Sequence, residues 1–75
     1  MESFYNELKK LREKNNIDLA EIHNRTKIDI VYLEALEEGK FDVLPRTYLR
    51  LFLRAYVMEI GGDTKDALNQ LDHYL

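Results

Sequence analysis

The chain has 75 residues, which is enough for one small domain with a modest core. It is 45% hydrophobic and 33% charged, a composition typical of a globular domain rather than a disordered chain. The lack of cysteine excludes a disulfide framework and a thiolate zinc site. The net charge of -3 argues against unspecific binding to nucleic acid.

The N-terminus does not resemble a secretory signal, and no apolar run approaches the roughly 20 residues of a membrane span. We therefore expect a cytoplasmic domain whose own residues make no membrane contact. Helical periodicity and helix-breaking residues divide it into five predicted helices with short connections, and no stretch alternates as a β-strand does. The predicted helices cover residues 3–14, 18–26, 29–38, 45–60 and 63–74.

Residues that favour helix ends define these boundaries. Ser3, Asp18 and Asp29 are of the types preferred as N-caps, and Glu21 completes a capping-box pattern with Asp18. Gly39 follows the third predicted helix, where a left-handed residue is favoured. Pro45 suits the first turn of the fourth helix because a missing N–H costs nothing there.

The second and third predicted helices are joined by a tight connection, which predicts a helix-turn-helix unit over about residues 18–38. We expect residues 1–75 to form a single all-α domain, a five-helix bundle that contains this unit. Residues 40–44 are predicted as a loop, with Phe41 and Leu44 folded back onto the core.

The helix predicted over 29–38 has an unusual charge. It carries four carboxylates and no cation, whereas the second helix of a DNA-binding helix-turn-helix reads bases with Arg, Lys, Asn or Gln. Its expected outward residues include Ile30, Val31 and Glu34. We interpret the carboxylates, Glu37 and Glu38 included, as a solvated face, which disfavours DNA binding.

The helix predicted over 45–60 has more apolar surface than a surface helix needs. Apolar residues cover well over half of its circumference, and Tyr48, Phe52 and Tyr56 form an aromatic row. Either this helix is the centre of the bundle or it presents an aromatic patch to a partner. Three arginines (Arg46, Arg50 and Arg54) form a basic stripe at i, i+4 and i+8, which could aid solubility, pair with nearby acids, guide an acidic partner or contact phosphate.

No sequence motif indicates an enzyme, a metal site or a cofactor. The chain has no Gly-rich phosphate loop, no nucleotide motif and no nucleophile–base arrangement. We predict no catalytic residues, no metal ligands and no cofactor.

The residues from Leu8 to Gly39 resemble the repressor-like, XRE-type helix-turn-helix superfamily. A closer resemblance is to the cytoplasmic domain of the RodZ family of bacterial cell-shape proteins. Three stretches carry it: residues 26–28 (TKI), 32–45 (YLEALEEGKFDVLP) and 48–56 (YLRLFLRAY). The chain departs from the superfamily at His23, where a small residue is usual, and has Lys27 where repressors have a turn glycine.

The RodZ resemblance implies a protein-interaction domain that binds the actin-like filament protein MreB. It also implies tethering to the inner membrane through a segment that these residues do not include. The family's aromatic pair for MreB binding falls on Phe52 and Tyr56, to which we add Tyr48, Arg50 and Arg54 as predicted partner-binding residues.

Two alternatives stay open at this stage. An XRE-type DNA-binding regulator would use the third helix and its flanks, with contacts from Lys27, Ile30, Val31, Tyr32 and Lys40. Self-association through the aromatic patch of the fourth helix is the other alternative.

Overall fold

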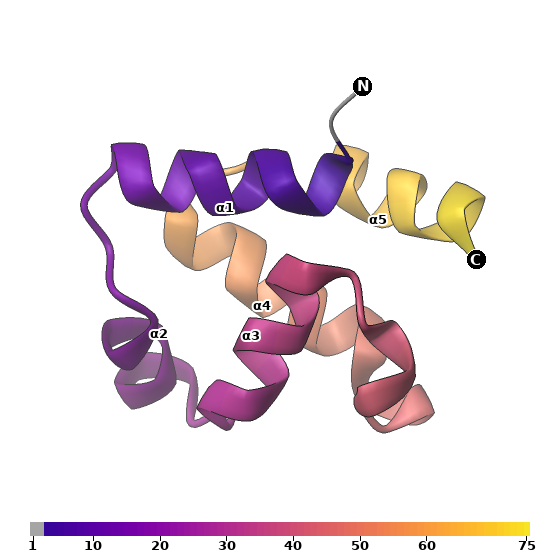
Figure 1. The fold of residues 1–75 in the computed structure, drawn as a ribbon, viewed down its shortest axis with the longest axis horizontal. Helices are drawn as coiled ribbons and strands as arrows, with labels where there is room; N and C mark the ends of the chain where they lie inside the picture. The colour runs from indigo at the N-terminus through magenta and orange to yellow at the C-terminus, as the bar shows by residue number, and fades with distance from the viewer. Residues whose placement is uncertain (1–2) are drawn as a thin grey trace.

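The computed structural model describes residues 3–75 as an all-α bundle of five helices and two short 3-10 turns (Figure 1). The five helices form the predicted architecture. The elements in chain order are α1 (Phe4–Lys14), α2 (Leu19–Thr26), α3 (Ile30–Glu38), η1 (Phe41–Val43), η2 (Arg46–Tyr48), α4 (Leu49–Ile60) and α5 (Thr64–Tyr74). None of the helices described is long and apolar enough to cross a membrane.

The helix ends follow the local sequence closely, with one exception. The side chains of Ser3, Asp29 and Asp63 each accept a hydrogen bond from a backbone N–H in the first turn of the following helix. Asp18 makes no such bond, so the predicted capping box at the start of α2 does not form.

The turn between α2 and α3 is closed by side chains. Lys27 adopts a left-handed conformation with φ of 64°, in the position where repressors have glycine. Nδ1 of His23 lies 2.7 Å from the carbonyl oxygen of Ile28, across the turn. The half-buried imidazole of His23 therefore stabilises the turn by contacting its backbone.

The fourth helix begins later than predicted. The α-helix starts at Leu49, and the residues after Pro45 form the 3-10 turn η2. The loop predicted over residues 40–44 contains a similar turn, η1. Phe41 and Leu44 point into the core as expected, with 5% and 4% of their surfaces exposed.

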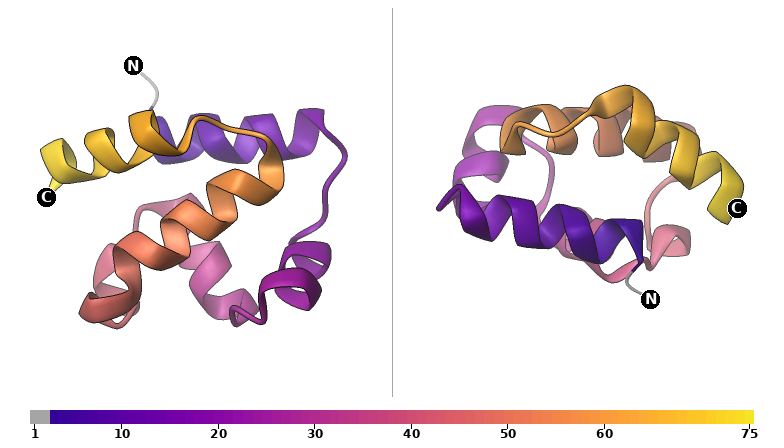
Figure 2. Two further views of the ribbon diagram at one scale, coloured as in Figure 1. Left: turned by 180° about the vertical axis from the view of Figure 1, so that it is seen from behind. Right: turned by 90° about the horizontal axis from the view of Figure 1, so that it is seen from above.

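One hydrophobic core joins all five helices. Its fully buried centre comes from α2, α3, α4 and α5, while α1 contributes half-buried apolar residues at its edge. Seen from behind, α4 lies across the bundle nearest to the viewer (Figure 2). The largest fully buried side chains are Tyr56, Ile22, Leu33, Leu36, Leu53, Ile60, Leu71 and Val57, four of which belong to α4.

A second cluster, made of aromatic rings, joins the two ends of the chain to η1. The ring of Phe41 lies 6.0 Å from that of Phe4 and 5.3 Å from that of Tyr74, measured between centroids. Tyr5 belongs to the same cluster and packs on Gly39, where an added Cβ would lie 2.4 Å from its ring. Gly39 has φ of 73°, so it both ends α3 and admits this ring.

Candidate functional site

The two sides of α4 differ sharply in exposure. Its inner side is formed by Leu49, Leu53, Tyr56, Val57 and Ile60, all of which are buried. The inner side of α4 therefore fills the core, as expected for the central helix of the bundle. The outer side nevertheless carries a continuous apolar row, which we call the outer stripe and which consists of Tyr48, Leu51, Phe52, Ala55 and Met58.

The outer stripe is open to solvent. Leu51 and Met58 are 56% and 58% exposed, and Tyr48 at the end of η2 is 49% exposed. Phe52 and Ala55 are half-buried between them. Residues three and four positions apart share one face of a helix, so these side chains form one surface. Exposed apolar residues that cluster in this way are typical of binding surfaces, whereas single ones are ordinary.

Phe52 links the outer stripe to α3. Its ring is stacked on Tyr48, with centroids 5.5 Å apart and planes 12° apart. On the other side its centroid lies 5.8 Å from that of Tyr32, which is half-buried on α3. Both contacts fix the Phe52 ring in place. Tyr48 is exposed and Phe52 is half-buried, and their role in partner binding stays a prediction.

Tyr56 does not lie on this surface, contrary to its prediction as a partner-binding residue. Its exposed fraction is 0%, and its side chain belongs to the hydrophobic core. The hydroxyl donates a hydrogen bond of 2.5 Å to Oε2 of Glu37 on α3. Burial, followed by this bond to a carboxylate, raises the pKa of Tyr56 well above its ordinary value. Tyr56 therefore positions α4 and has no surface with which to contact a partner.

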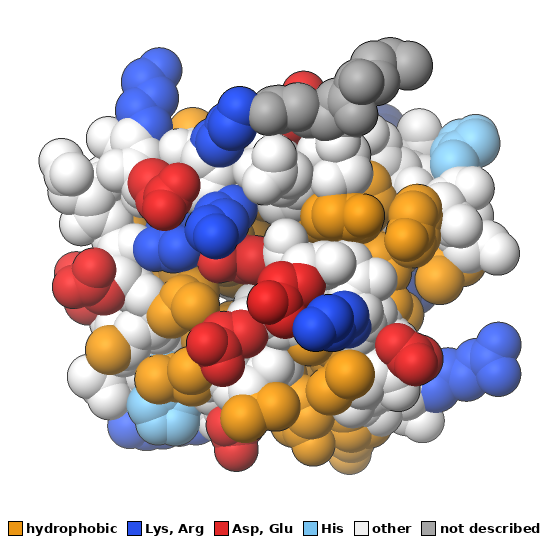
Figure 3. All heavy atoms as spheres, viewed as in Figure 1, with side chains coloured by type: hydrophobic (Ala, Val, Ile, Leu, Met, Phe, Trp, Pro, Cys, Tyr) orange, Lys and Arg blue, Asp and Glu red, His pale blue; other side chains and the backbone are white. Residues whose placement is uncertain are grey.

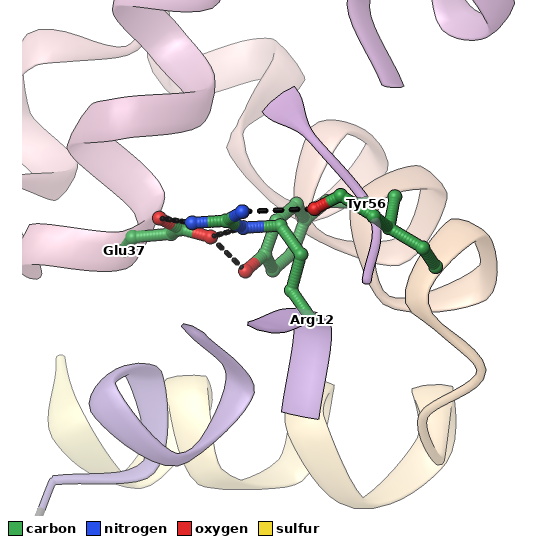
Figure 4. Close-up of polar contacts among 4 residues, drawn as sticks. Arg12, Glu37 and Tyr56 are labelled. Carbon is green, nitrogen blue, oxygen red and sulfur yellow. Dashed lines mark hydrogen bonds and ion pairs between the residues drawn. The ribbon is translucent and has the colours of Figure 1, made fainter. Parts of the chain in front are cut away.

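Glu37 is also buried, contrary to the interpretation of all the α3 acids as a solvated face. It is 7% exposed and faces Arg12 of α1 (Figure 4). Nε of Arg12 lies 2.5 Å from Oε2 of Glu37, and Arg12 also donates to Oε1 at 3.1 Å. A third bond of 2.9 Å joins Nη1 of Arg12 to the carbonyl oxygen of Ile17. The hydrogen bond with Glu37 raises the pKa of Arg12.

This Arg12–Glu37–Tyr56 cluster ties α1, α3 and α4 together at one buried point. A buried ion pair is tolerated when its geometry is good and its remaining polar atoms are satisfied. Here the contacts are bidentate, and no buried side-chain polar atom within residues 3–75 lacks a partner. Local sequence patterns do not reveal this cluster, because Glu37 is 25 residues from Arg12 and 19 residues from Tyr56.

The predicted basic stripe divides into paired and unpaired members. Arg50 forms an ion pair with Asp72 on α5. Arg46 and Arg54 are exposed, and no carboxylate lies within ion-pair distance of either among residues 3–75. On the opposite edge of the outer stripe, Glu59 lies 3.8 Å from Arg25 of α2. Of the two unpaired arginines, Arg54 lies on α4 itself, beside Leu51 and Met58.

The solvent-facing side of α3 is acidic, as predicted for Glu34 and Glu38 (Figure 3). Val31 is 56% exposed, while Ile30 and Tyr32 are half-buried. Lys27 and Lys40 are exposed at the two ends of α3, and Lys40 lies 3.4 Å from Glu38. A duplex placed on this side would bring its phosphates close to carboxylates.

Comparisons with known proteins agree with this architecture. A family model described as a helix-turn-helix domain matches residues 7–66. The chain belongs to this family. The helix-turn-helix domain is also 40% identical over 48 residues to a Bacillus subtilis (strain 168) protein named uncharacterized membrane protein YmfM. The aligned region is 63% of this chain and 17% of that relative, so the chain spans a small part of its length. No solved structure matches the chain.

The side chains described offer no obvious site for a metal ion. Residues 3–75 hold no group of three or more His, Asp or Glu arranged to bind one.

Two exposed residues of the outer stripe, Leu51 and Met58, were not among the predicted partner-binding residues. Their signal was present in the apolar coverage of the 45–60 helix, which exceeded what the core requires.

Proposed function

We propose that this domain is a non-enzymatic protein-interaction module that docks on the actin-like filament protein MreB through the outer stripe of α4. The observation that carries the proposal is the exposure of a continuous apolar row on a helix whose inner side already fills the core. Covering such a row with a partner is favourable, because apolar area leaves water. The identity of the partner rests on the resemblance to the RodZ family.

The same resemblance supports a place next to the membrane. The B. subtilis relative is named as a membrane protein, and the aligned region is a small part of it. We propose that the domain lies on the cytoplasmic side of the inner membrane, tethered through another segment of its protein. In that arrangement the domain would link a cytoskeletal filament to the membrane.

The proposal is tested by co-sedimentation of the purified domain with MreB filaments. The double variant Leu51→Gln/Met58→Gln makes the outer stripe polar without changing the core. We expect its affinity to fall by about 30-fold or more, since loss of an interface hot spot costs about 2 kcal/mol or more. Val31→Gln is the matched control, because Val31 is 56% exposed, as is Leu51, but lies on α3.

Three outcomes of this experiment are informative. Loss of binding in the double variant with retention in Val31→Gln supports the outer stripe. Equal binding by all three proteins, each with unchanged helical circular dichroism, would contradict this site. No binding by the wild type would contradict MreB as the partner.

The alternative function is that of a DNA-binding regulator that uses α3. The exposed lysines at its two ends, Lys27 and Lys40, favour it. Titration of a labelled duplex at low salt tests it, since binding through phosphates weakens steeply as salt rises. We expect no binding, because Glu34 and Glu38 lie between the two lysines on the side that would meet the duplex.

A further inference from the structure

The charges beside the outer stripe indicate the chemistry of its partner. Arg54 is three residues after Leu51 and four before Met58, so it lies along the edge of the stripe. It is exposed and has no carboxylate partner among residues 3–75. A partner that covers Leu51 and Met58 would also remove water from around this guanidinium. Removing water from a charged group costs free energy unless an opposite charge on the partner pairs with it.

Arg50 differs from Arg54 in this respect, although the sequence places the two on one stripe. Arg50 of α4 pairs with Asp72 of α5 at the surface, where both side chains are more than half exposed. Its positive charge is already balanced within the domain. Arg54 is therefore the cation of α4 whose charge is left for a partner.

We propose that the outer stripe takes an acidic amphipathic segment, with apolar side chains facing Leu51, Phe52 and Met58 and with an Asp or Glu paired to Arg54. This inference rests on the proposed function and specifies the kind of surface that the partner offers. It removes Tyr56 and Arg50 from the predicted partner-binding residues, and it adds Leu51 and Met58.

The same charges disfavour a second copy of this chain as the occupant. The only carboxylate within α4 is Glu59, and Arg25 of α2 already balances it. The adjoining turn η2 contributes Arg46 and no acid. Two outer stripes placed together would therefore bring unpaired arginines, and no unpaired carboxylate from these elements, into the contact.

The test is the affinity of the domain for MreB filaments after charge reversal. Arg54→Glu should lower the affinity by about tenfold or more relative to Lys9→Glu, because it would face the partner's carboxylate with a like charge. Lys9→Glu makes the same charge change at an exposed position on α1, outside the outer stripe. Arg54→Lys should retain most of the binding. Higher salt should narrow the difference, since salt screens exposed charges.

The outcomes separate this inference from the proposed function. If Leu51→Gln/Met58→Gln abolishes binding but Arg54→Glu behaves like Lys9→Glu, the acidic partner is wrong and the docking site stands. If the wild type does not bind filaments, both are wrong. If sedimentation shows a dimer of the domain that Leu51→Gln/Met58→Gln disrupts, the occupant is a second copy and the inference is overturned.

Discussion

The two sides of α4 differ in burial and in surroundings, and we propose that the inner side serves stability and the outer side recognition. Phe52 and Tyr56 are aromatic residues one turn apart, yet Tyr56 is fully buried and Phe52 lies at the edge of an exposed row. The difference comes from their surroundings. The Tyr56 hydroxyl donates to Glu37, which also pairs with Arg12, whereas Phe52 packs against two other rings and the edge of the core. Substitutions on the inner side should therefore change stability, and those on the outer side should change binding.

The largest effect on stability is expected from Glu37→Gln. It leaves the mostly buried guanidinium of Arg12 without its counter-charge, which typically costs about 3–5 kcal/mol when one partner of a buried pair is removed. Chemical denaturation followed by circular dichroism measures this loss. Glu38→Gln, at the exposed neighbouring position, should change stability by less than about 0.5 kcal/mol. Equal effects of the two substitutions would show that the buried cluster does not hold the helices together.

A smaller effect is expected from the Tyr56 hydroxyl, and it depends on pH. The folded domain keeps this proton above pH of about 10, where a tyrosine in the unfolded chain loses it. The protonated Tyr56 hydroxyl therefore makes its full contribution to stability below about pH 10. Above that pH the free energy of unfolding decreases by about 1.4 kcal/mol per pH unit. Unfolding free energies measured between about pH 9 and 11 should stay level up to about pH 10 and then fall with this slope in the wild type, whereas Tyr56→Phe should lack this fall. An unchanged slope in Tyr56→Phe would contradict the assignment, and Tyr48→Phe serves as the exposed control.

The smallest effect on stability is expected on the outer stripe. Leu51→Gln alters a side chain that is 56% exposed and outside the core, so the free energy of unfolding should change by no more than about 0.5 kcal/mol. Thermal unfolding is a sufficient measurement. A loss similar to that of a core substitution such as Leu53→Ala, for which about 2–5 kcal/mol is typical, would mean that the stripe belongs to the core.

The fold could be predicted from the sequence because its signals are local. Ser3, Asp29 and Asp63 cap helices as their residue types suggest, and Gly39 ends α3 in the left-handed conformation. The predicted start of α4 was wrong, because Pro45 is compatible with a 3-10 turn as well as with an α-helix. These features depend on neighbours within one or two turns.

The site could be predicted only in part, because contacts between residues far apart in the sequence decide which side of α4 is buried and which is exposed. The apolar coverage of α4 indicated an excess of hydrophobic surface, but it did not say which residues the core would use. Tyr56 is buried through a partner 19 residues away, and Arg12 reaches Glu37 across 25 residues. Helical periodicity has no information at such separations, so Glu37 was grouped with its solvated neighbours.

The Arg12–Glu37–Tyr56 cluster also has a consequence for the kinetics of recognition. Because three helices are fastened at one buried point behind the outer stripe, the backbone of α4 is already ordered before a partner arrives. Little entropy then remains to be lost in arranging this surface, and association needs no slow rearrangement of the domain. Encounter and release should follow single-step kinetics, with the free and the filament-bound domain superimposing closely along α4.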